Sequence, residues 1–216
     1  MKNTIIAIIA VLIIGVGGWY FMSKGTDTTG PVAVVNGEEV TRDQYKVLED
    51  QVKAEQGTNF ALLSVEDKAQ LQTQIIDTLV SQALLRQAIA EANITVTDEQ
   101  VAEQMTTIRG QFADEAAYTQ ALTAQNLTED GLRDQVRTEL TTQAYFEQKL
   151  SFSTITVTDE EIATAYEEIS ASQENVPALE EAREQVRGLL IQQKQQALVN
   201  AHLEELRGQA EVEVLI

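Results

Sequence analysis

The sequence predicts a mostly α-helical domain that is closed by a small antiparallel sheet of its N- and C-terminal strands and is preceded by one transmembrane helix. Three observations support this prediction. An uncharged apolar segment opens the chain, a β-branched run with an Asn-Gly turn follows it, and helical periodicity with repeated helix-start motifs then fills nearly all of the remaining sequence. Because the chain ends in an alternating tail, its two ends can pair in one sheet.

The first segment, residues 4–22, is long enough to span a bilayer. It contains no charged residue, and a helix of this length extends about 28 Å, close to the thickness of the hydrocarbon layer. A cleaved signal peptide is the alternative, but its apolar region is shorter and ends at small residues. Here the segment leads into bulky Trp19 and Tyr20. We therefore expect an uncleaved signal anchor.

Charge sets the expected orientation of this anchor. Lys2 and the terminal amino group precede the apolar segment and Lys24 follows it, and this slight bias favours a cytoplasmic N-terminus. The predicted parts are therefore residues 1–3 in the cytoplasm, the membrane anchor, a small polar tether over 23–31, and a domain over 32–216 outside the cytoplasm, on the periplasmic or cell-wall side.

The part of the chain after the apolar segment is strongly acidic. It holds all 34 acidic residues and 14 of the 15 Lys and Arg residues, which gives it a formal charge of −20. Such a surface stays soluble and repels phosphate backbones. We therefore expect no nucleic-acid partner.

The expected sheet is built from both ends of the exported domain. Residues 32–40 contain a β-branched run followed by Asn36-Gly37, and both turn residues tolerate positive φ, which indicates a hairpin. The tail over 211–216 begins with alternating Glu and Val. Since an isolated hairpin is only marginally stable, we expect the tail to add a third strand beside residues 32–40.

Seven helices are predicted between these strands, and three of them begin with the same motif. A Thr with Gln or Glu three residues later forms a capping box, and a Val before the Thr packs on the fourth helical residue as a hydrophobic staple. These starts are Thr41-x-x-Gln44, Thr97-x-x-Gln100 and Thr158-x-x-Glu161. The helices are expected over residues 41–56, 64–92, 97–111, 114–125, 128–151, 158–172 and 177–208.

Two of these helices have informative faces. The helix over 64–92 has a broad apolar face, typical of a central helix that packs on more than one side. In the helix over 177–208 the apolar stripe passes through Gln192 and Gln196, so we expect its middle third to be more solvated or to meet a partner. Pro177 is expected in its first turn. The stripe itself consists of Leu179, Ala182, Val186, Leu189, Val199, Leu203 and Leu206.

The sequence offers no recognisable catalytic chemistry. It has no cysteine and one histidine, His202, so a zinc site of ordinary type cannot be built. It also lacks the glycine motifs of nucleotide-binding loops and the nucleophile motif of hydrolases. We therefore expect no catalytic residue, no cofactor, no nucleotide and no metal. His202 is expected to be a half-exposed helix residue.

Several runs resemble a known family. VAVVNGEEVTRDQY, LVSQALLRQAIAEANITVTDEQV and FADEAAYTQALTAQNLTEDGLRDQVRTEL are similar to the N-terminal chaperone domain of SurA, which also frames the related foldases PrsA and PpiD. The segment from Val176 to the tail AEVEVLI looks like the helix and strand that close that domain. The resemblance spans about residues 32–216 and implies a SurA-N-like fold.

One departure from that family bears on activity. The foldases carry a parvulin prolyl isomerase domain, usually inserted after a segment like ITVTDEEIATAYEE. Here only residues 168–176 separate that segment from the closing helix, whereas a small domain needs on the order of a hundred residues. We therefore expect that the parvulin domain and its isomerase activity are absent.

The resemblance implies an extracytoplasmic, membrane-anchored holdase that binds unfolded or partly folded exported polypeptides without ATP. The alternative is a membrane-anchored scaffold with one dedicated folded envelope partner, for which the Gln-rich middle of the last helix would form the interface. An enzyme is a third hypothesis, for which the sequence offers no residues. For the holdase, amphipathic helices over 97–151 are expected to expose an apolar groove, and the candidate client-binding residues are Met105, Phe112, Tyr118, Tyr145 and Phe146.

Overall fold

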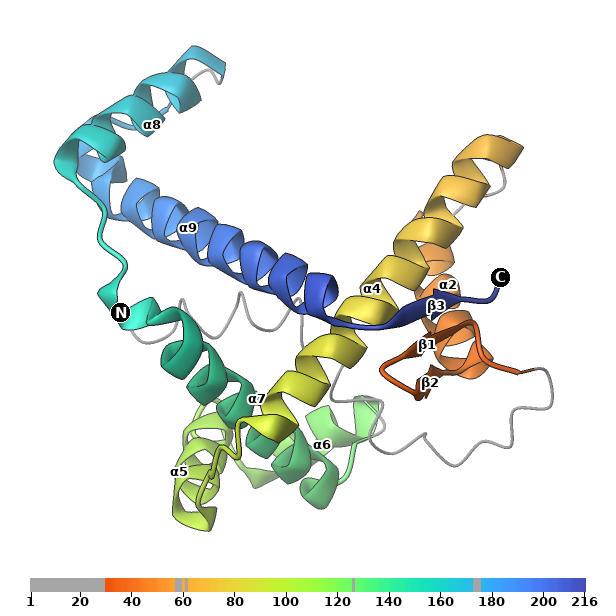
Figure 1. The fold of residues 1–216 in the computed structure, drawn as a ribbon. Coiled ribbons are helices and arrows are strands. Elements are labelled where there is room, and N and C mark those ends of the chain that lie inside the picture. The colour runs from red at the N-terminus through yellow and green to blue at the C-terminus, as the bar shows by residue number, and fades with distance from the viewer. Residues whose placement is uncertain (1–29, 57–59, 61, 126, 173–175) are drawn as a thin grey trace.

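The computed structural model describes residues 30–56, 60, 62–125, 127–172 and 176–216. These residues form seven α-helices, a short 3-10 helix and three strands, so the prediction of a mostly helical domain with a small sheet is confirmed (Figure 1). The helices are α2 (Arg42–Gln56), α4 (Val65–Glu91), α5 (Asp98–Arg109), α6 (Glu115–Ala124), α7 (Glu129–Leu150), η1 (Phe152–Thr154), α8 (Asp159–Ser172) and α9 (Leu179–Gln209). The strands are β1 (Ala33–Val35), β2 (Glu38–Val40) and β3 (Val212–Val214).

The expected membrane anchor over residues 4–22 lies outside the described residues, as do residues 1–3 and most of the tether over 23–31. Within the part of the chain that the structure describes, no helix is both long and apolar enough to cross a membrane. The anchor therefore stays a prediction.

The sheet joins the two ends of the domain, as the sequence predicts. The strand order is β2-β1-β3, and β1 pairs antiparallel with both neighbours. Asn36 and Gly37 form the hairpin turn with φ values of 51° and 83°. Asn36 also fixes the third strand. Its backbone N–H donates to the Glu211 carbonyl at 2.8 Å, and its side-chain Oδ1 accepts from the Glu211 N–H at 2.9 Å.

The repeated helix starts form as the capping boxes that the sequence predicts. At Thr97 the backbone N–H donates to Gln100 Oε1 at 2.8 Å, and the Gln100 N–H donates back to Thr97 Oγ1 at 3.3 Å. The Thr41 and Thr158 boxes have the same reciprocal bonds. A fourth box, which the sequence analysis missed, starts α4, where Ser64 pairs with Asp67 because Asp serves in place of Gln or Glu.

Two expectations for α9 are wrong. The helix begins at Leu179, so Pro177 lies before its first turn. The Pro177 carbonyl instead accepts a hydrogen bond from the Tyr166 hydroxyl at 2.8 Å. The expected apolar stripe is wrong at Leu189, which is 39% exposed while Leu190 packs in its place. The middle third is more solvated, as expected, since Gln192 and Gln196 are exposed, although Gln195 is buried. The reason is that a 31-residue helix shifts its buried face as it passes from one packing partner to the next.

α4 is the central helix, as its broad apolar face predicts. One apolar cluster joins β1 and β2 to the face of α4 that carries Ile75, Leu79 and Val80, with α2 and the C-terminal end of α9 packed around it. A second cluster lies at the other end of α4, where Leu85 meets Tyr145 of α7 and Val199 of α9.

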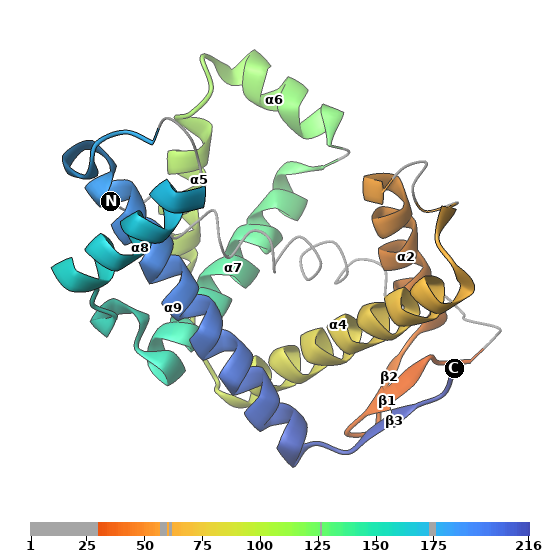
Figure 2. The same cartoon turned by 90° about the horizontal axis from the view of Figure 1, so that it is seen from above.

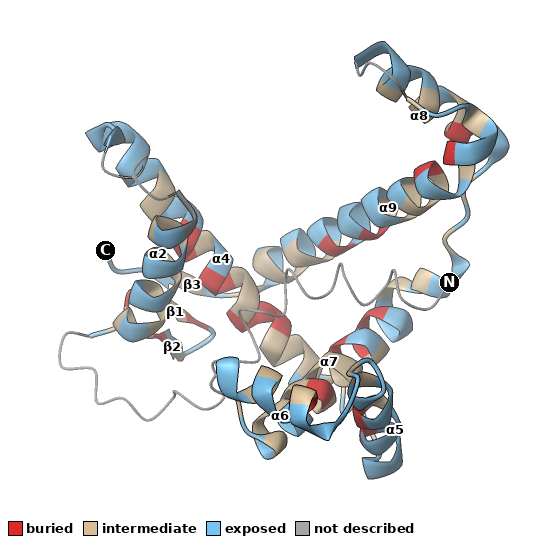
Figure 3. Cartoon of the chain, turned by 180° about the vertical axis from the view of Figure 1, so that it is seen from behind, coloured by how far each residue is buried: buried red, intermediate tan, exposed pale blue. Residues whose placement is uncertain are grey.

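Two further clusters lie on separate arms. α5 and α7 share Val101, Met105 and Val136, and α8 packs on the first half of α9 around Ile162 and Val186. Figure 2 shows the resulting open framework, in which α4, α7 and α9 diverge from one region and carry α2, α6 and α8 at their far ends. The buried residues in Figure 3 accordingly form short stretches along the helices rather than one continuous core.

Candidate functional site

The five residues that the sequence analysis singled out do not form one groove. Met105 lies in the cluster between α5 and α7, and Tyr145 and Phe146 lie where α7 meets α4 and α9. Tyr118 of α6 packs edge to face against the half-buried Phe112 with ring centroids 5.5 Å apart. All except Phe112 are buried in this conformation. Client contact at these residues stays a prediction, and for the four buried ones it requires the helices to part.

Three side chains from α5, α6 and α7 form a polar hub, which we name the Glu129 hub. The Tyr118 hydroxyl donates to Glu129 Oε2 at 2.6 Å, and Arg109 Nη2 donates to Glu129 Oε1 at 2.8 Å. The Arg109 guanidinium also lies over the Tyr118 ring, 4.9 Å from its centroid, and is 3.5 Å from Glu115. The hub therefore joins α5, α6 and α7 through one carboxylate. We call these three helices the lobe.

The stability that the Glu129 hub contributes is expected to depend on pH. The hydrogen bond from Tyr118 and the charge of Arg109 hold the pKa of the Glu129 carboxyl below its usual value. A lowered folded-state pKa gives stability that is present above the usual carboxyl pKa and is lost as pH falls through the folded-state value. Arg109, Arg133 and Glu115 are the charged groups around it.

We therefore expect Glu129→Gln to lower the free energy of unfolding at pH 7, and to lower it by progressively less as the pH falls to 3. Urea unfolding of both proteins at the two pH values measures this. Asp130→Asn is the matched control, because Asp130 occupies the same helical turn and is exposed. An equal loss of stability for Glu129→Gln at both pH values would contradict the assignment.

A second polar contact lies at the meeting point of α4, α7 and α9. The Tyr145 hydroxyl and Nε2 of His202 share a hydrogen bond of 2.7 Å, and Nδ1 of His202 lies 3.4 Å from Glu205. Burial, then the negative charges of Glu205 and Glu91, raise the pKa of Tyr145. The His202 side chain is only 11% exposed. The expectation of a half-exposed histidine holds in part: the residue is half-buried, and Tyr145 of α7 packs against its ring.

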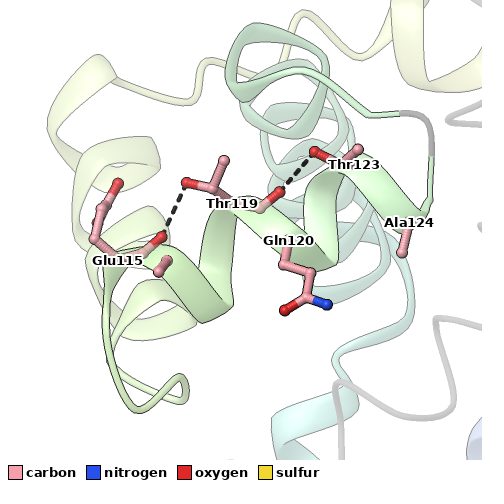
Figure 4. A pocket seen from close by; sticks show the side chains of 6 residues that line it. Glu115, Thr119, Gln120, Thr123 and Ala124 are labelled. Carbon is pink, nitrogen blue, oxygen red and sulfur yellow. Dashed lines mark hydrogen bonds between the residues drawn. The ribbon is translucent and has the colours of Figure 1, made fainter.

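A shallow hollow of about 660 Å³ lies along the outer face of α6 (Figure 4). The hydroxyls of Thr119 and Thr123 donate to the carbonyls four residues earlier, at 2.9 Å each, so the threonines present methyl groups to the hollow. Residues 116–128 contain no charged side chain. Apart from Glu115, the described residues of its lining are therefore uncharged: Ala116, Thr119, Gln120, Thr123 and Ala124.

Among the described residues, the most exposed large apolar side chains lie elsewhere, and none of them was among the predicted client-binding residues. Leu62 and Val65 are 82% and 86% exposed where α4 begins, and Val47 on α2 is also exposed. Leu189 and Leu198 are exposed on α9, and Leu189 lies on the same face as the exposed Gln192 and Gln196. The sequence does contain a signal for exposed Leu62 and Val65. Residues 57–65 carry no charge, and their apolar residues fit neither of the flanking helical patterns.

The apolar side chains are spread over several helices of an acidic domain, which suits weak contacts with varied segments. Within the described residues no group of three or more His, Asp and Glu side chains is arranged to hold a metal ion.

The comparison with known families identifies the class of this domain. A model of the SurA-like N-terminal domain matches residues 1–146. The chain therefore belongs to this family, as the resemblance in its sequence indicates. The match is to the N-terminal domain, and no parvulin domain is detected beside it.

Two curated relatives agree with this family. The chain is 29% identical over 185 residues to "Foldase protein PrsA" of Caldanaerobacter subterraneus subsp. tengcongensis, covering 78% of this chain and 52% of that protein. It is 29% identical over 153 residues to "Periplasmic chaperone PpiD" of Haemophilus influenzae, covering 65% of this chain and 24% of that protein. The chain thus spans about half the length of the first relative and about a quarter of the second.

Proposed function

We propose that this protein is a membrane-anchored, extracytoplasmic holdase that binds unfolded or partly folded exported polypeptides without ATP and without prolyl isomerase activity. Family membership over residues 1–146 is the observation that carries this proposal. The relatives named as a foldase and a periplasmic chaperone support the client class and the compartment. The uncharged segment over residues 4–22 supports the anchor.

The open framework supports a mechanism in which a client is covered by several weak contacts. Exposed apolar side chains lie on α2, at the start of α4 and on α9, so an extended client can touch more than one arm. Each contact buries little area and gives little affinity, which suits clients of differing sequence. The acidic surface keeps the complex soluble and favours clients with basic stretches.

The test titrates residues 27–216 against several labelled unfolded proteins and their folded counterparts, with aggregation followed in parallel. Micromolar binding to the unfolded forms alone, with delayed aggregation, is expected. A prolyl isomerisation assay on the same fragment is expected to show no turnover. The anchor is tested separately, by recovery of the full chain in the membrane fraction and of residues 27–216 in the soluble fraction.

A double substitution sharpens this test. Leu62→Ser with Val65→Ser is expected to weaken client binding about tenfold, the equivalent of 1.4 kcal/mol, because each side chain gains apolar burial only when a client covers it. Since both are more than four-fifths exposed, the thermal midpoint is expected to stay unchanged. Unchanged client affinity would remove these residues from the binding surface.

The second candidate is a scaffold with one folded envelope partner. Exposed Leu189 together with Gln192 and Gln196 on α9 favours it, because the three residues lie at helical spacing on one face and form a mixed apolar and amide surface. Binding of no unfolded protein in the titration, together with one crosslinked partner for the full chain in its membrane, would establish the scaffold in place of the holdase.

A further inference from the structure

α6 is joined to the rest of the lobe by unusually little packing. Tyr118 is its one buried side chain, and its contacts with other described elements are sparse. In Figure 2 it lies at the outer end of the lobe, beyond α5 and α7. By contrast, α5 and α7 pack extensively against each other.

The apolar cluster of this lobe contains no residue of α6. Its buried members are Val101 and Met105 of α5 and Val136 of α7, with half-buried neighbours also drawn from α5, α7 and the segment before α5. Therefore α6 can leave this lobe without exposing the cluster that holds α5 to α7. Separation of α6 would expose Tyr118 and break the hydrogen bond from its hydroxyl to Glu129.

We propose that α6 is a flap that swings away from the α5–α7 pair, and that the Glu129 hub holds it closed. The hub is suited to this role because its charged members are half exposed: the side chains of Arg109 and Glu129 are 48% and 38% exposed. Ion pairs at such positions are weakened by water and salt and contribute modestly. The closed state is thus held by one buried ring and one shared carboxylate, which makes local opening easier than unfolding of the lobe.

Opening has a structural consequence that does not depend on any client. It uncovers the ring of Tyr118 and its partner Phe112, together with the half-buried Leu122 on the same helix. The flap therefore changes how much apolar surface the lobe offers to solvent, while the described fold of α5 and α7 persists.

Thiol labelling of the full chain, purified in detergent, tests the flap. The chain has no cysteine, so Leu122→Cys introduces a single reporter on α6, and Val136→Cys in a separate protein reports on the α5–α7 cluster. Adding Glu129→Ala is expected to raise the labelling rate at Leu122→Cys about tenfold, the ratio expected when a hydrogen bond to a charged group is lost. The rate at Val136→Cys is expected to stay unchanged.

The matched control is Asp130→Ala, which removes an exposed acid from the same helical turn and is expected to leave both rates within about twofold. Tyr118→Phe is a second variant, which keeps the ring and removes only the hydroxyl that donates to Glu129, and it is expected to raise the Leu122→Cys rate alone. An unchanged rate at Leu122→Cys in both hub variants would overturn the proposal. So would a parallel rise at Val136→Cys, because the whole lobe would then be opening.

Discussion

Tyr145→Ala is expected to lower the free energy of unfolding by about 3–5 kcal/mol, the range for removing a large buried aromatic ring. Tyr145 is buried where α4, α7 and α9 meet, and its ring packs edge to face on Phe146 at 5.8 Å. Tyr145 is one of the four buried side chains in the described cluster that joins these helices, so its removal takes away a large part of that cluster. Such a loss is a large share of the stability of an ordinary domain.

Urea unfolding of residues 27–216 measures this effect as a fall in the midpoint. Tyr145→Phe is the matched control, because it keeps the ring and removes only the hydroxyl that bonds to His202. The expected cost of this control is about 1 kcal/mol, that of one lost hydrogen bond. Equal effects of the Ala and Phe variants would show that the ring does not hold the junction.

Removing β3 by ending the chain at Gln209 is expected to cost on the order of 3 kcal/mol, since several backbone hydrogen bonds of about 1 kcal/mol each are lost. β1 loses its partner along Ala33–Val35, and the bonds between Asn36 and Glu211 and from the Leu215 N–H to the Val32 carbonyl also disappear. The remaining hairpin is expected to be marginal alone. We therefore expect faster amide exchange in β1 and β2.

Hydrogen exchange of the truncated and intact domains measures this prediction. The control is Leu215→Ser with Ile216→Ser, which keeps the backbone of β3 and changes only exposed side chains. This control is expected to retain the protection of β1. Fast exchange in the control as well would mean that the apolar side chains, and not the backbone pairing, hold the third strand.

Local sequence patterns predicted the helix starts and the hairpin well, because these features depend on interactions between residues only a few positions apart. The Thr97 start requires only that Gln100 lies three residues on, and the Asn36-Gly37 turn requires only two residues that accept positive φ. The pairing of the tail with β1 was also predictable, since a two-stranded hairpin needs a third strand and the tail alternates.

The candidate site was less predictable, because helical periodicity shows which face of a helix is apolar but not which other segment packs against that face. Tyr118 and Phe112 share a region of sequence with Met105, yet the first two pack beside the Glu129 hub and Met105 packs between α5 and α7. The hub itself depends on Arg109 and Glu129, which are 20 residues apart and meet only when α5 and α7 pair. Nothing in either local pattern distinguishes them from solvated surface charges.

The sequence thus determines the helices, their starts, the hairpin and the charge of this domain, because hydrogen bonds over three or four residues and side-chain periodicity act within one segment. The tertiary structure decides which apolar faces are covered. It buries Tyr145 at a junction of three helices beside the half-buried His202, leaves Leu62 and Val65 exposed, and attaches α6 through Tyr118. Burial is a property of pairs of segments distant in sequence, so only their arrangement in space fixes it.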